Sequence, residues 1–96
     1  MARGRGDVSL ESLPNIGVEV AARLREAGIA NPSELVRIGS VEAAYRLARA
    51  RPLDPPCRSM LSGLEGAIRG VRWHAIPKEE RDRIWSAYER RLAAPR

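Results

Sequence analysis

The chain has 96 residues, and its 17 Lys and Arg against 12 Asp and Glu give a formal net charge of +5 at pH 7. This length suits one compact domain rather than two. No apolar run approaches the roughly 18 residues that a membrane span needs, and no apolar stretch follows the basic N-terminus as it would in a secretory signal. We therefore expect a cytoplasmic protein without a membrane partner.

The composition offers little for catalysis or metal binding. One cysteine, Cys57, excludes an internal disulfide framework, and with one histidine, His74, it does not supply the ligands of a conventional structural zinc site. The sequence contains no paired-carboxylate signature and no phosphate-binding loop. We therefore expect no enzymatic activity, no metal and no cofactor.

Helical patterns begin after a short basic segment. We assign residues 1–8 to a flexible basic arm and residues 9–96 to a helical domain. One short helical turn is expected over residues 9–13, and the Pro-Asn-Ile-Gly sequence of residues 14–17 predicts a tight turn. A helix with apolar residues at helical spacing follows, and Gly28 ends it.

Two further helices are expected before the proline-rich break at residues 52–56. Asn31 is a good N-cap with Pro32 in the first helical position, and Gly39 ends that helix. Ser40 then caps a second helix, whose apolar face is formed by Val41, Ala44, Tyr45 and Ala48.

The helix after the break carries an apolar stripe that we expect to be buried, formed by Cys57, Met60, Leu61, Leu64 and Ile68. Gly63 and Gly66 lie in the same helix and indicate the close approach of a neighbouring helix, since an interior glycine otherwise costs about 1 kcal/mol. Residues 71–76 connect this helix to the last one, which Pro77 opens.

Several aromatic and polar residues have two interpretations. Trp73 could stack on a base, but packing against Gly63 and Gly66 is favoured. His74 could be a pH-sensitive or ligand-binding group, but a partly exposed structural role is favoured. Trp85 and Tyr88 could form a dimer surface, although the amphipathic pattern favours the domain's own core.

Residues 13–24 resemble a helix-hairpin-helix motif. In such a hairpin a residue that tolerates positive φ precedes an apolar residue and a glycine, here Asn15, Ile16 and Gly17. The free backbone N–H groups that open the second helix, those of Gly17 and Val18, can bind a phosphate oxygen. The neighbouring Glu19 would repel that phosphate. The fold class we expect is all-α, with about five short helices in a helix-hairpin-helix or SAM-like bundle.

The positive charge is concentrated in the middle of the chain. Residues 46–72 contain six arginines against Asp54 and Glu65, a surplus of four. Arginine suits bidentate phosphate contacts, so DNA is a candidate partner. The alternative is a solvated charged surface without a specific partner. The candidate phosphate-binding side chains are Arg46, Arg49, Arg58, Arg69 and Arg72.

Several segments occur in the order found in one known family. They are residues 13–17 (LPNIG), 24–29 (LREAGI), 33–35 (SEL), 38–47 (IGSVEAAYRL), 64–70 (LEGAIRG) and 73–77 (WHAIP). Over roughly residues 10–85 the chain resembles the C-terminal domain of the TfoX/Sxy competence regulators. The resemblance implies a helix-hairpin-helix-like fold and a role in regulating natural transformation, in partnership with a cyclic-AMP receptor protein.

Two hypotheses follow. The first is a small regulatory binding module that docks on a protein, by resemblance a transcriptional regulator, with DNA as a second candidate partner. The alternative is a helical domain that binds only protein or associates with itself as a homodimer, without nucleic-acid contact.

Overall fold

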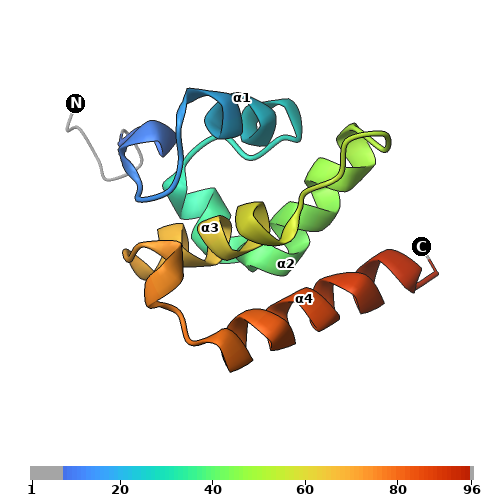
Figure 1. Ribbon diagram of the computed structural model, residues 1–96. Coiled ribbons are helices and arrows are strands. Elements are labelled where there is room, and N and C mark those ends of the chain that lie inside the picture. Colours follow the sequence, from blue (N-terminus) through green and yellow to red (C-terminus); the bar gives the residue numbers. More distant parts are fainter. Residues whose placement is uncertain (1–7, 96) are drawn as a thin grey trace.

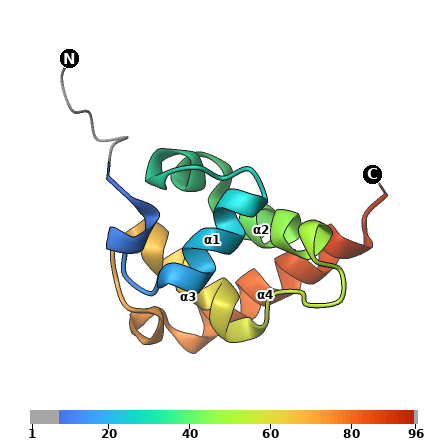
Figure 2. The same cartoon turned by 90° about the horizontal axis from the view of Figure 1, so that it is seen from above.

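The computed structural model describes residues 8–95, which form four α-helices and two short 3-10 turns and contain no strand. The elements are η2 (Leu10–Ser12), α1 (Val18–Glu26), α2 (Pro32–Ala50), α3 (Arg58–Arg69), η3 (Trp73–Ala75) and α4 (Lys78–Ala93). Helices α2 and α3 form a middle layer, with α1 on one side and α4 on the other (Figures 1 and 2). The all-α prediction is confirmed. The predicted arm at residues 1–8 lies outside the described residues except for Val8.

The number of helices differs from the expected five. The two helices predicted on either side of Gly39 meet there without an intervening loop and form the single element α2. Gly39 itself has φ 85° and ψ 165°, so the helical backbone is broken at the predicted place. The hairpin has only the 3-10 turn η2 as its first arm. The finer helix-hairpin-helix or SAM-like assignment stays a prediction.

The predicted start of α2 is confirmed, but the predicted cap at Ser40 has another role. Asn31 accepts a hydrogen bond from the Glu34 backbone N–H at 2.9 Å, and Pro32 occupies the first turn. Ser40 is buried, and its hydroxyl donates to the Glu65 carboxylate on α3 at 2.6 Å. This side chain therefore links α2 to α3.

The core lies where the three layers meet. Tyr88 of α4 is 1% exposed, which confirms that it packs within the domain, and Trp85 lies half-buried beside it with ring centroids 5.1 Å apart. Burial raises the pKa of Tyr88, because the phenolate would lose its hydration. The largest fully buried side chains besides Tyr88 are Leu10, Leu24, Ile29, Leu35, Leu47, Leu61, Leu64 and Ile76.

Cys57 is exposed, so the prediction that it is buried was wrong. It is the N-cap residue of α3 and has an extended backbone (φ −88°, ψ 176°), so its side chain does not follow the helix's apolar face. The buried stripe of α3 begins at Leu61, with Met60 partly buried.

The proline-rich segment is fastened to α1 by arginines. Arg23 is only 5% exposed, and its Nη2 donates to the Asp54 backbone carbonyl at 2.7 Å. Arg51 pairs with Glu26 at 2.8 Å. The segment is thus bound to α1 rather than serving as a free linker.

The close packing at the two α3 glycines comes from the hairpin turn and the connector, not from a neighbouring helix as predicted. A Cβ at Gly66 would lie 2.6 Å from Asn15 Nδ2 and 2.6 Å from the Val71 carbonyl oxygen. A Cβ at Gly63 would lie 3.4 Å from Asn15 Cβ, an ordinary contact.

These distances predict opposite effects for the same substitution. Gly66→Ala should lower the free energy of unfolding by about 1–3 kcal/mol, since overpacking outweighs the gain in helix propensity. Gly63→Ala should be neutral or stabilising by up to about 1 kcal/mol. Urea denaturation followed by circular dichroism measures both. Equal effects in the two variants would contradict the packing described here.

A second prediction concerns the ion pair between η2 and α1. Two hydrogen bonds from Arg25, at 2.9 and 2.7 Å, lower the pKa of Glu11 to about 2. Because the folded pKa is depressed, the pair's contribution to stability is complete above the usual glutamate range and is lost as the pH falls towards 2. An NMR titration of the Glu11 side-chain carboxyl should show this value, and Arg25→Ala should return the pKa to the ordinary range.

Candidate functional site

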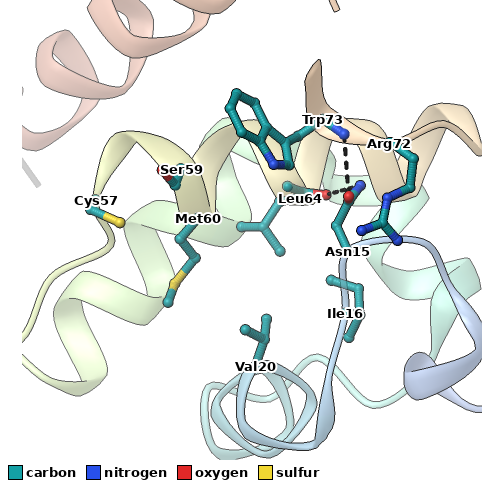
Figure 3. Close-up of a pocket in the computed structure, with 10 residues that line it drawn as sticks. Asn15, Ile16, Val20, Cys57, Ser59, Met60, Leu64, Arg72 and Trp73 are labelled. Atoms are coloured by element: carbon teal, nitrogen blue, oxygen red, sulfur yellow. Dashed lines mark hydrogen bonds between the residues drawn. The ribbon is translucent and has the colours of Figure 1, made fainter. Parts of the chain in front are cut away.

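Asn15 fastens the hairpin turn to α3 and to the connector. It is the non-glycine residue with positive φ in the described chain, at 69°, as the turn sequence predicted. Its Nδ2 donates to the carbonyls of Gly63 at 3.3 Å and Val71 at 2.9 Å. Its Oδ1 accepts from the Trp73 backbone N–H at 3.2 Å (Figure 3). One side chain therefore holds three segments together.

Beside Asn15 lies a groove of about 400 Å³ between the hairpin, α1 and α3. Its apolar surface comes from Ile16, Val20, Met60 and Leu64, and Figure 3 shows these side chains converging on one space. Ile16 and Leu64 are buried, whereas Val20 and Met60 are partly exposed. The groove therefore presents accessible apolar surface on a well-packed floor.

The two ends of the groove differ in chemistry. Cys57 and Ser59, both exposed, lie at one end, and Arg72 and Asn15 lie at the other (Figure 3). Both polar atoms of the Asn15 side chain are already hydrogen-bonded within the domain. Arg72 is the charged residue of the lining. The groove thus suits apolar side chains, with one cation at its Asn15 end.

Trp73 forms a wall of this groove. It is half-buried, the Arg81 guanidinium lies 5.3 Å from its ring centroid, and His74, which is exposed, packs edge-on at 5.5 Å. A Cβ at Gly66 would lie 3.3 Å from the Trp73 Cα, so Trp73 packs against that glycine through its backbone. Arg81 already occupies a face of the ring, which disfavours base stacking there.

Three of the five candidate phosphate-binding arginines are held in ion pairs. Arg46 pairs with Glu42 at 3.5 Å, Arg58 with Asp82 at 2.9 Å, and Arg69 with Glu65 and Glu80 at 2.8 Å each. Arg58 and Arg69 also lie at opposite ends of α3, about 16 Å apart along its axis. The structure therefore does not collect these three into one free cationic surface.

The other two candidates differ from these. Arg49 donates to the Tyr45 hydroxyl at 3.0 Å, which lowers the pKa of Tyr45. Arg72 is exposed and lies beyond 4 Å from every carboxylate of residues 8–95. Of the predicted set, Arg72 is therefore the side chain that both borders a groove and has no carboxylate partner among residues 8–95.

The predicted backbone site at the start of α1 is open to solvent. Gly17 is the N-cap residue, and Val18 is 77% exposed. The exposed Glu19 occupies the first turn, where its charge favours the helix dipole but opposes a phosphate.

The part of the chain that the structure describes lacks a metal-binding cluster and a membrane-spanning helix. Residues 8–95 contain no cluster of three His, Cys, Asp or Glu side chains suited to a metal ion. Within the same range, every helix is too short or too polar to cross a membrane.

Comparison with known proteins supplies a family and a fold. The family model of the TfoX C-terminal domain matches residues 7–88. An uncharacterised protein from Listeria monocytogenes, solved in a triclinic form, is 35% identical, with a TM-score of 0.78 over 86% of this chain and 92% of that chain. A protein of unknown function from the same organism, in a tetragonal form, is 35% identical, with a TM-score of 0.76 over 85% of this chain and 98% of that chain. No curated protein matches the chain.

Two substitutions at Asn15 separate its hydrogen bonds from its backbone conformation. Asn15→Gly should lose about 2 kcal/mol of stability, because three hydrogen bonds disappear while positive φ stays accessible. Asn15→Ala should lose about 1 kcal/mol more, because alanine is disfavoured in the left-handed region. Urea denaturation checks the order wild type, glycine, alanine. An alanine variant as stable as the wild type would refute the fastening role of Asn15.

Proposed function

Since the chain belongs to the TfoX C-terminal domain family, we propose that it is a small regulatory binding module that docks on a protein partner. The regulatory part rests on the family, which is of a regulatory type and is not a known enzyme family. The resemblance to competence regulators makes a transcriptional regulator the expected partner. The docking surface we propose is the groove between the hairpin, α1 and α3.

The observation that carries the proposal is accessible apolar surface in a concave site. Val20 and Met60 leave part of their side chains exposed above the buried Ile16 and Leu64. Concave apolar sites with few polar groups are where proteins bind apolar side chains of their partners. Burial of Met60 and Val20 by a partner would remove this surface from water, which favours association.

DNA is the second candidate, supported by the open N-terminus of α1 at Gly17 and Val18. Two features support the protein hypothesis over it. Glu19 places a negative charge at that helix start, and Arg46, Arg58 and Arg69 already pair with carboxylates. Affinity for duplex DNA depends on several free cations that displace condensed counterions.

The test begins with partner identification. The immobilised chain is incubated with an extract of the native cells, and each captured protein is identified, purified and titrated against the chain by calorimetry. Met60→Glu, which puts a charge on the groove wall, and Ser59→Trp, which fills its mouth from an exposed position, should each weaken binding more than about tenfold. Thermal melts confirm that both variants are folded.

Ser86→Trp is the matched control, because Ser86 is an exposed serine on α4 that lies outside the groove lining. It should bind as the wild type does. A partner that binds Met60→Glu and Ser59→Trp with unchanged affinity would refute the groove as the docking surface.

A labelled 20-base-pair duplex is titrated in parallel at low and moderate salt. Tight binding with a steep salt dependence, undiminished by Ser59→Trp, would establish the DNA alternative instead.

A further inference from the structure

We infer that the protein segment docked in the groove is acidic as well as apolar, with its apolar side chain over Met60 and Leu64 and a carboxylate bound to Arg72. This inference rests on the proposed function and adds the chemical class of the partner to it. It follows from which positive charges the domain leaves uncompensated and where those charges lie.

Most of the domain's cations are already matched with acids. Of the 14 Lys and Arg side chains in residues 8–95, nine lie within 4 Å of a carboxylate in that range. The five that do not are Arg49, Arg72, Arg81, Arg83 and Arg90. Within the described part of the chain, internal ion pairs therefore leave five positions where an external anion meets a charge without a carboxylate partner in that range.

Two of these five lie near Trp73. Arg72 lies at the Asn15 end of the groove, and Arg81 stacks on the Trp73 ring and lines the neighbouring cavity between α3 and α4. Part of the Arg81 guanidinium is already hydrogen-bonded within the domain, because its Nε donates to the Ile76 carbonyl at 3.0 Å. Arg72 therefore supplies the exposed donor group, and Arg81 adds positive potential behind Trp73.

The surface beside Arg72 favours a carboxylate on a protein segment over a phosphate chain. The guanidinium of Arg72 can donate two parallel hydrogen bonds to either kind of anion, so the neighbouring surface decides between them. The surface next to it is the apolar wall of Ile16, Val20 and Leu64, which a nucleic-acid backbone could not cover without losing hydration. An amphipathic protein segment covers both surfaces at once.

The groove also has a direction. The lining at the Cys57 end carries no charged residue, whereas Arg72 occupies the opposite end (Figure 3). The apolar side chain of the segment is therefore expected in the middle of the groove and its acidic residue towards the hairpin. A segment with the acid at the other end would lie in the opposite orientation.

The experiment uses a phage-displayed library of random 16-residue peptides selected on the wild-type domain. The enriched peptide is synthesised with a fluorescein label, alongside a counterpart in which every Asp and Glu is replaced by Asn and Gln. Enriched sequences should combine apolar and acidic residues. Arg72→Gln and the amide counterpart should each weaken binding about tenfold, and Arg72→Glu should weaken it further. When the Arg72→Gln variant is titrated with the amide counterpart, the affinity should be little lower than with either change alone.

Arg83→Glu is the matched control, since Arg83 is also exposed and unpaired among the described residues but lies on α4 outside the groove. It should bind within about twofold of the wild type, because exposed charges outside the contact are screened by salt. The bound peptide should also slow alkylation of Cys57, the chain's only cysteine, at the far end of the groove.

The outcomes separate the two proposals. Binding that Ser59→Trp abolishes but that is insensitive to Arg72→Glu would keep the groove and overturn the acidic partner. Binding that survives both Ser59→Trp and Met60→Glu would overturn the groove and with it the proposed function. Failure to enrich any peptide, or enrichment of peptides without acids, overturns the inference. Salt-sensitive binding of a labelled DNA duplex that Arg72→Glu abolishes would assign Arg72 to phosphate and overturn it as well.

Discussion

Asn15 makes the contact on which the rest of the site depends. Its left-handed backbone turns the chain into α1, and its side chain uses both polar atoms to hold α3 and the connector before α4. That contact requires the absence of a side chain at Gly66, where a Cβ would collide with the Asn15 amide. A turn residue and a helix glycine 51 positions apart in the sequence are therefore parts of one contact.

The same contact determines the chemistry of the groove. Because the amide of Asn15 is satisfied inside the domain, the hairpin end of the groove offers no free amide group to a ligand. The connector is fixed at the Trp73 N–H, so the adjoining Arg72 stands at that end as a side chain on an anchored backbone. A cation placed beside an apolar wall by rigid backbone selects partners by shape and charge together.

Local signals in the sequence predicted the features that depend on neighbours along the chain. The cap at Asn31, the break at Gly39 and the positive φ at Asn15 each follow from the conformations that one residue type tolerates. Cys57 shows the limit of periodicity, because the apolar stripe predicted its burial but the N-cap backbone turns it outward. Helical spacing describes faces only within a helix, and a helix boundary is uncertain by a residue or two.

The groove and the ion pairs depend on tertiary packing and could not be predicted in this way. The arginine-rich stretch of residues 46–72 indicated an anionic partner, yet Arg58 meets Asp82, 24 residues away, and Arg69 meets Glu80, 11 residues away. The composition gives the number of charged residues. A ligand, however, interacts mainly with the charges that the fold leaves unpaired. In this domain the unpaired charge that borders the apolar groove belongs to one arginine rather than to a broad basic stretch. This arrangement favours the proposed selective contact with a protein over the binding of a polyanion.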